Sequence, residues 1–457
     1  MAHRTPADPA AVSDPVRAWH DLLGDAALQA ESAGRLHELQ PERSLTFGER
    51  RICRTLRPNL LTAERYERAI QAARGVHSAL ITLERTLLGD SELRRELELE
   101  PEEERLALAE TGHSHSSPSM RLDSFFGDEV RYVECNAESP AGMAYEDMLA
   151  SVFRELPVMR AFRRRYHARS LPVRTQMQSC LLRSFREWGQ ERRPVLAIVD
   201  WPGLPTANEF TLFKEYFERH GLQTIICEPA ELEFRSGRLH AGSIPVNLVY
   251  KRVLTSELLA RPEAARGLVQ AHLAGAVCVV NTFRGKLLHK KVSLALLSDE
   301  RYQQLYSSAQ RKAVARHVPW TRRLREGSSS AAQKPVKDLV QHVLKNRHKL
   351  VLKPNDEYGG KGVVLGWTVS DGQWESAVKE GLDRPSVVQE AVPVPREPFP
   401  VVLDDSVQLL SLAVDMDPYL FHGRPGGMLT RLSSSELLNV TAGTGSIVPT
   451  FLVEERR

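Results

Sequence analysis

The pattern of apolar and polar positions predicts a chain that begins helical and later mixes strands with helices. From Pro15 to about Ala109, apolar residues recur at helical spacing among charged ones, most clearly in residues 61–88. Residues 119–138 instead predict two strands joined at Gly127 and Asp128, because side chains 131–136 alternate in the strand manner. Helical spacing returns in residues 143–162.

Strands and helices alternate in residues 194–281, which is typical of a small, mainly parallel sheet. The expected strands are 195–200, 223–227, 247–251 and 276–281, with a decorating hairpin at 234–239. One helix presents Phe210, Phe213 and Phe217 on a single face, which we interpret as core.

The remaining residues predict a third region. Residues 325–335 have the composition of a linker or mobile loop, and a helix to about Asn346, strands and glycine-rich turns follow, with a last strand near 447–453. We therefore expect an α/β (α+β) fold in four ranges: a disordered tail 1–15, a helical region with a strand pair 16–190, an α/β domain 191–310, and a last region 311–457.

Composition narrows the class of protein. The 457 residues include 61 Lys and Arg against 58 Asp and Glu, a net charge of +3, which does not favour a nucleic-acid-binding protein. The five cysteines form no Cys-x-x-Cys pair, so we expect reduced thiols and no cysteine-ligated zinc. No apolar stretch is long enough to span a bilayer, and residues 1–16 lack a signal-peptide core, so we expect a soluble cytoplasmic protein that binds no membrane.

A glycine-rich loop is the first candidate for chemistry. The apolar strand 350–352 ends in Lys353, and a polar loop with Gly359, Gly360 and Gly362 follows before the next strand. Glycines let backbone N–H groups approach phosphate oxygens, and the lysine supplies a positive charge. A strand follows the loop where a P-loop would have a helix, and a plain β-hairpin is the alternative.

The two strands of residues 119–138 carry a second candidate. Arg121 and Asp123 share one strand face, as do Glu134 and Asn136, because residues i and i+2 point the same way. If the strands pair, two carboxylates, an amide and an arginine meet, a set suited to Mg²⁺ and phosphate. Surface ion pairs on a hairpin are the alternative.

Two weaker signals and a histidine loop complete the candidates. The apolar strand 387–388 ends in Gln389 and Glu390, which could receive a nucleoside, and Lys291 begins an apolar helix after a strand. His113 and His115 lie in a loop by composition; two histidines without visible co-ligands favour a flexible substrate-side loop over a metal site.

Together these segments resemble the circularly permuted ATP-grasp carboxylate–amine ligases, the branch that includes glutathionylspermidine synthase. The order is shared: Arg121-Leu122-Asp123 and Glu134-Cys135-Asn136 first, then an α/β domain, Lys291, Lys353 with its glycine loop, and the hinge residue Glu390. The resemblance covers roughly residues 55–455. Residues 423–446 also resemble the end of such domains, where Arg431 and Asn439 would contact nucleotide phosphate or acyl substrate; turns in a β-rich lid are the alternative.

The resemblance implies a permuted ATP-grasp fold with a Rossmann-like domain and an ATP- and Mg²⁺-dependent ligase that forms an acylphosphate. Asp123, Glu134 and Asn136 would hold Mg²⁺, and Arg121 would stabilise the transferring phosphoryl group. The nucleotide would contact these residues: Lys291, Lys353, Gly359, Gly360, Gly362, Gln389, Glu390 and Arg431. The substrates would be a small-molecule or peptide carboxylate and an amine.

Two other functions stay open at this point. The chain could be a non-ligating nucleotide-binding module or a partner subunit of a peptide-modifying complex, which the intact Arg, Asp, Glu and Asn set argues against. It could also be an NAD-type oxidoreductase, but residues 200–203 lack Gly-x-Gly-x-x-Gly. The sequence leaves open the substrates and whether the chain forms a homo-oligomer.

Overall fold

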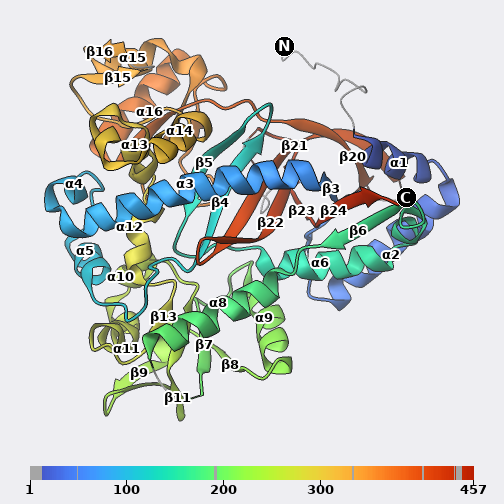
Figure 1. The fold of residues 1–457 in the computed structure, drawn as a ribbon, viewed down its shortest axis with the longest axis horizontal. Helices are drawn as coiled ribbons and strands as arrows, with labels where there is room; N and C mark the ends of the chain where they lie inside the picture. Colours follow the sequence, from blue (N-terminus) through green and yellow to red (C-terminus); the bar gives the residue numbers. More distant parts are fainter. Residues whose placement is uncertain are drawn as a thin grey trace.

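The computed structural model describes residues 13–48, 50–189, 193–331, 334–403, 406–436, 438 and 445–456. In these ranges the chain forms a mixed α/β fold in which helices pack around several sheets (Figure 1). Most of the predicted tail, residues 1–12, lies outside the described residues, and the first helix already begins at Asp14. None of the helices in the described ranges is long and apolar enough to cross a membrane.

The predicted N-terminal helices are present. They are α1 (Asp14–Leu22), α2 (Ala26–Glu42), α3 (Ala63–Gly89), α4 (Ser91–Arg95) and α5 (Pro101–Leu108), with the short strands β1 (Thr46–Phe47) and β2 (Arg50–Arg51) after α2. Thr62 caps α3 by accepting from the backbone N–H of Arg65. The buried face of α3 follows helical spacing through Ala69, Val76 and Leu83, and the helix crosses in front of the largest sheet (Figure 1).

The largest sheet is antiparallel and joins strands that are far apart in sequence. Its order is β23 (Ser446–Val448), β22 (Arg424–Ser433), β21 (Ser406–Phe421), β4 (Ser119–Phe126) and β5 (Val130–Asn136), and β20 (Arg396–Leu403) also pairs with β21. The predicted hairpin of β4 and β5 is confirmed. Strands from the predicted ranges 16–190 and 311–457 therefore share one sheet.

The predicted parallel sheet is confirmed as well. Its order is β13 (Cys278–Val280), β12 (Leu248–Lys251), β7 (Val195–Val199) and β8 (Gln223–Cys227), all parallel. The surrounding elements are α8 (Val173–Trp188), α9 (Ala207–Arg219), α10 (Thr255–Leu259), α11 (Pro262–Leu273) and a small sheet of β9 (Leu232–Arg235), β10 (Arg238–Ala241) and β11 (Ile244–Val246). Phe210, Phe213 and Phe217 are buried, as the core interpretation of this face predicted.

A second small sheet carries the glycine-rich loop and forms what we call the roof. Its strands are β14 (Thr321–Arg323), β19 (Ser386–Glu390), β17 (Leu350–Pro354) and β18 (Val364–Leu365), with helices α15 (Leu339–Lys345) and α16 (Asp371–Asp383). The roof has a hydrophobic cluster of its own, which includes Trp374, Val343 and Val388.

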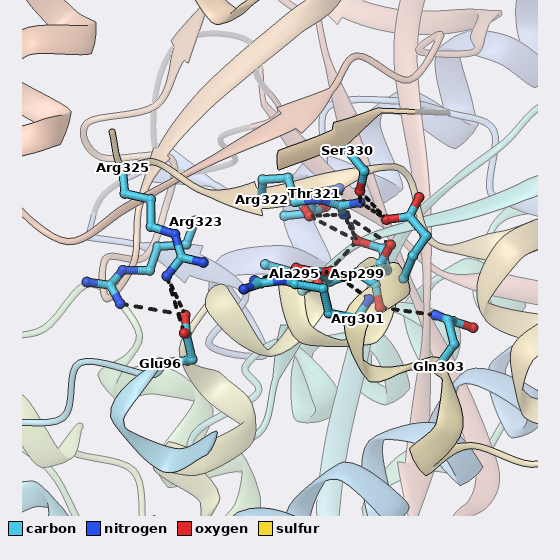
Figure 2. Close-up of polar contacts among 12 residues, drawn as sticks. Glu96, Ala295, Asp299, Arg301, Gln303, Thr321, Arg322, Arg323, Arg325 and Ser330 are labelled. Atoms are coloured by element: carbon cyan, nitrogen blue, oxygen red, sulfur yellow. Dashed lines mark hydrogen bonds and ion pairs between the residues drawn. The ribbon is translucent and has the colours of Figure 1, made fainter. Parts of the chain in front are cut away.

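The linker prediction for residues 325–335 is wrong for residues 329–331 and 334–335, because these belong to the antiparallel strand pair β15 (Ser329–Ala331) and β16 (Lys334–Val336). Polar contacts hold it: the Trp320 indole donates to the carbonyl oxygen of Ser330 (2.7 Å), and Arg322 donates to its hydroxyl (3.0 Å). Figure 2 shows the contact between Arg322 and Ser330 and, beside it, Arg323 and Arg325 reaching Glu96 near the end of α4. These ion pairs connect the roof to the N-terminal helices.

The remaining elements complete the body. A three-stranded sheet places β24 (Thr450–Glu455) between β3 (Asn59–Thr62) and β6 (Tyr166–Ser170). The helices are α6 (Met143–Glu155), α7 (Pro157–Phe162), α12 (Lys286–His289), α13 (Val292–Ser298) and α14 (Ser308–His317). Helix α13 packs against α3 and against β14 of the roof.

Candidate active site

A cavity lies between the largest sheet and the roof. Every predicted site residue except Gly362 lines it: Arg121, Asp123, Glu134, Asn136, Lys291, Lys353, Gly359, Gly360, Gln389, Glu390 and Arg431. Segments that lie more than 300 residues apart in the chain, such as those carrying Asp123 and Arg431 (308), meet at this cavity.

The floor of the cavity is the hairpin of β4 and β5. In its register Arg121 is opposite Asn136 and Asp123 is opposite Glu134, so the two i, i+2 pairs share one face. The Arg121 guanidinium donates to both carboxylate oxygens of Asp123 (2.7 and 3.0 Å), and the Asn136 amide donates to Asp123 Oδ1 (2.8 Å). A register shift follows directly after Asp123, where a bulge can re-aim a side chain.

Arg431 on β22 is surrounded by three carboxylates. Its Nη2 lies 2.7 Å from Asp123 Oδ2, 2.6 Å from Asp415 Oδ2 and 2.9 Å from Asp417 Oδ2. Burial opposes ionisation of Asp123, but Arg121 and Arg431 hold its pKa well below the ordinary value. Burial and the neighbouring carboxylates raise the pKa of Asp417 far above its ordinary value.

Asp415 and Asp417 were absent from the sequence prediction. They are two alternating acidic positions on β21, whose inner half is otherwise buried and mostly apolar. Spacing of two in an apolar strand puts both on one face, so this signal was available in residues 412–420. Arg431, in contrast, was predicted to contact nucleotide. It lines the cavity, and its guanidinium donates to Asp415 and Asp123.

Two lysines face Glu134 across the cavity. Lys291 Nζ lies 3.1 Å from Glu134 Oε1 and also donates to the carbonyl oxygen of Glu357 in the glycine loop. Lys353 Nζ donates to Val133 O (3.1 Å) and to Gln389 Oε1 (2.7 Å). Burial opposes ionisation of Glu134, yet Lys291 and then Lys353 keep its pKa below the ordinary value. Burial lowers the pKa of Lys353 to about 8, although Glu134 counteracts part of this effect.

Gln389 and Glu390 differ in position although they are neighbours at the end of β19. Gln389 is buried, accepts from Lys353 and donates to the Thr321 hydroxyl (3.0 Å), so it orients the lysine. Glu390 is exposed at the rim, where Arg131 Nη2 lies 3.7 Å from its carboxylate. The rim also carries Trp367, whose indole donates to Glu436 across the cavity entrance.

The glycine-rich loop connects β17 to β18 above the cavity. Gly359, Gly360 and Gly362 have φ values of 63°, 76° and 70°, in the left-handed region that favours glycine. Gly362 does not line the cavity, and a Cβ added at this glycine would lie 2.7 Å from the Pro354 ring. Tyr358, between β17 and the glycines, donates from its hydroxyl to Glu257 of α10 (3.2 Å).

The histidine loop is not on the cavity, and the prediction of a flexible substrate-side loop is wrong. His113 is buried, with Nε2 3.0 Å from Val279 O, and the His115 ring meets the His422 ring edge to face at 4.8 Å. Burial lowers the pKa of both loop histidines, so both pack as neutral rings. Asn439, the other tail residue of interest, lies outside the described residues.

The donor set at the floor suits magnesium. Asp123, Glu134 and Asn136 offer two carboxylates and one amide, the hard oxygen ligands that Mg²⁺ takes together with phosphate oxygens. Arg121 and Arg431 hold the pKa of Asp123 low, and Lys291 and Lys353 place two ammonium groups near Glu134, a type of group that pairs well with phosphate oxygens.

Comparisons with known proteins support the fold. No family model and no curated protein sequence matches the chain. Among solved structures, a glutathione synthetase-like effector from Globodera pallida aligns over 98% of this chain and 100% of its own, with a TM-score of 0.57 and 12% identity. A putative gamma-glutamylcysteine synthetase from Methylobacillus flagellatus aligns over 83% of this chain and 85% of its own, with a TM-score of 0.41 and 11% identity. The chain thus shares the overall fold of the glutathione synthetase-like effector.

Proposed function

We propose that this protein is an ATP- and Mg²⁺-dependent ligase that joins a carboxylate to an amine through an acylphosphate. One observation carries the proposal: a single cavity brings together oxygen ligands on paired strands, two lysines and a glycine-rich loop. These are the parts that phosphoryl transfer requires, since its catalysis is mostly positioning and neutralisation of charge. A glutathione synthetase-like fold is consistent with such chemistry.

The order of the parts supports a circularly permuted ATP-grasp arrangement. The strand pair β4–β5 precedes the glycine loop in the chain, and the parallel sheet between them would be the Rossmann-like domain. Both β4 and β5 complete a sheet whose other strands, β20 to β23, come after the roof. A circular permutation moves the strand pair to an earlier place in the sequence and leaves its place in the fold unchanged. It would therefore produce both the permuted order and the shared sheet.

Each residue at the cavity would then have a defined task. Magnesium held by Asp123, Glu134 and Asn136 would supply neutralisation of phosphate charge. Lys291 and Lys353 would bind phosphate oxygens, and Arg121 and Arg431 would fix Asp123 and face the transferring group. The nucleoside would lie toward the rim near Gln389 and Glu390.

The reaction itself needs no covalent bond to the protein. An oxygen of the substrate carboxylate attacks the γ-phosphorus, and the bond to the ADP oxygen breaks. The amine then attacks the acyl carbon, inorganic phosphate leaves, and the amine loses a proton. Gly359 and Gly360 would close over the phosphates and keep out water, which would otherwise hydrolyse the acylphosphate.

A phosphate-release screen tests the proposal. ATP and Mg²⁺ are supplied with amino acids, short peptides and polyamines, and amine-stimulated release together with a C–N-linked product is the expected result. Glu134→Gln should lower turnover about 100-fold or more. Glu129→Gln is the matched control, since Glu129 pairs with Arg316 on the surface (2.6 Å) outside the cavity.

Two outcomes would argue against the assignment. Near-normal turnover in folded Glu134→Gln protein would refute the assignment of Glu134 as a magnesium ligand. Tight ATP binding by the wild type without release in any substrate combination would instead favour a non-ligating nucleotide-binding module.

A further inference from the structure

A second cluster of charged side chains lies beneath the glycine-rich loop and outside the cavity. It combines two carboxylates of the body, one loop carboxylate and three lysines: Glu103, Glu138, Asp356, Lys251, Lys286 and Lys290. None of them lines the cavity. Lys251, Lys286 and Glu138 have fully buried side chains, which is costly unless every charge is paired.

Glu138 is the fixed centre of this cluster. It follows Asn136 by two residues, directly after β5, and its Oε1 accepts from Lys251 Nζ (3.3 Å), from the Thr255 N–H (3.1 Å) and from the Thr255 hydroxyl. Its Oε2 accepts from Lys286 Nζ (3.2 Å). The carboxylate therefore connects the candidate metal strand to the parallel sheet and to α12.

Lys286 passes this connection on to the glycine-rich loop. Besides Glu138, its ammonium reaches Glu103 Oε1 (3.4 Å) and donates to Asp356 (2.7 Å). Lys290, one helical turn later, lies 2.8 Å from Glu103 Oε2 and 3.5 Å from Asp356 Oδ2. Burial opposes the charge of Lys286, but the three carboxylates raise its pKa above the ordinary value. Burial likewise opposes the charge of Asp356, but Lys286 and Lys290 lower its pKa.

A bound metal ion is the competing interpretation of this cluster. Ligand atoms of Glu138, His289 and Asp356 lie within 4.8 Å of one another. However, the Lys286 ammonium contacts two of these three groups, so a cation of the protein already supplies the positive charge there.

Asn355, the residue before Asp356, is also held in place, by hydrogen bonds to the backbone of other segments. Asn355 is buried, its carbonyl oxygen accepts from the Lys291 N–H (2.9 Å), and its amide donates to Leu97 O (2.9 Å). Beyond Asp356 the loop becomes more exposed, and Tyr358 and Lys361 are on the surface. The loop thus has a held stem, residues 355–356, and an exposed turn, residues 358–362.

We propose that Lys286 is a positioning residue that fixes the stem of the glycine-rich loop through Asp356, so that only the turn moves when nucleotide binds. The inference rests on the proposed function for its effect on ATP. The anchoring itself does not depend on that function, because all its contacts exist without nucleotide. Lys286 acts through Asp356 and does not line the cavity.

Hydrogen exchange without nucleotide tests the anchoring by itself. Asp356→Asn keeps the size of the side chain but removes its charge, and backbone exchange in residues 355–363 should accelerate about tenfold. Asp383→Asn, an exposed position at the end of α16 in the same roof, should leave that exchange unchanged. Asp356→Glu, which keeps the charge, should restore at least part of the protection.

Unchanged exchange at 355–363 in Asp356→Asn would overturn the proposal, and so would acceleration spread evenly over the whole roof, which would indicate general destabilisation. In the ligase assay, Asp356→Asn should raise the KM for ATP about tenfold with a smaller change in kcat. An unaltered KM despite a loosened loop would contradict the link to nucleotide. A wild type that does not use ATP would refute the proposed function and leave the exchange result interpretable.

Discussion

Lys353 should make nucleotide binding weaken as the pH rises from 7 to 9. Its ammonium lies on the cavity wall between Val133 O and Gln389 Oε1, and burial lowers its pKa to about 8. If only the charged lysine binds phosphate, the charged fraction sets the apparent affinity. With a pKa of about 8 that fraction falls from about 0.9 at pH 7 to about 0.1 at pH 9, so the apparent Kd should rise about tenfold.

Calorimetric titration of ATP at fixed Mg²⁺ and ionic strength measures this dependence. A terminal phosphate with a pKa of about 6 is already ionised above pH 7, so the nucleotide contributes little of the slope. Lys353→Arg should bind ATP with nearly constant affinity, because a guanidinium stays charged throughout. Lys361→Arg, on the exposed turn of the same loop, should keep the wild-type slope. A wild-type Kd that is constant within about twofold from pH 7 to 9 would refute the reasoning.

The same pKa shift makes the free energy of unfolding depend on pH in the opposite direction to nucleotide binding. Its pKa falls from 10.5 to about 8 on folding, so between these values the unfolded chain binds more protons at this site than the folded chain does. The contribution of Lys353 to the free energy of unfolding therefore rises with pH in that window. Urea denaturation of wild type and Lys353→Met at pH 8 and pH 10 should show a smaller rise in the variant.

Three further substitutions test other parts of the structure. Because burial and the neighbouring carboxylates raise the pKa of Asp417 on folding, Asp417→Asn, which stays neutral, should gain stability relative to wild type as the pH rises through and above the ordinary carboxyl range; a difference in denaturant titration that does not change with pH would contradict this. Glu96→Gln should lower the free energy of unfolding by about 1 kcal/mol, and by less at high salt, because it removes the shared partner of Arg323 and Arg325. As a control, Glu92→Gln removes an exposed ion pair with Arg95 and should leave the free energy of unfolding almost unchanged. Trp374→Ala should cost about 3–5 kcal/mol and accelerate hydrogen exchange mainly in the roof, whose hydrophobic cluster contains it; uniform acceleration over the whole chain would show that the roof has no independent stability.

The sequence predicted those parts of the site that depend on local geometry. Arg121 and Asp123 were assigned to one strand face by their spacing alone, and the register with Asn136 and Glu134 follows from the short turn at Gly127. The parallel sheet was predicted for a similar reason, because its strands are short apolar runs separated by helices. In both cases neighbouring segments of the chain form the structure.

Features that depend on distant contacts were not predicted. The sequence gives no sign that β21 pairs with β4, so Asp415 and Asp417 had no known partners. No local pattern predicts the role of Lys286, because its three carboxylate partners come from three separate segments. Residues 325–335 were misread since glycine and serine suggested mobility, whereas Trp320 and Arg322 hold Ser330. His113 was misplaced because loop composition does not reveal burial against Val279.

The position of β24 between β3 and β6 has a consequence for how the protein is made. Asn59 and Thr450, which are in contact, are 391 residues apart in the chain. Residues 450–455 must therefore leave the ribosome before β24 can pair with β3 and β6. Until then the three-stranded sheet beside the N-terminal helices lacks its central strand. Such non-local pairing slows folding and exposes apolar surface during synthesis. Chains cut before residue 450 should accordingly be recovered as aggregates or with chaperones, even though the cavity residues are all present in them.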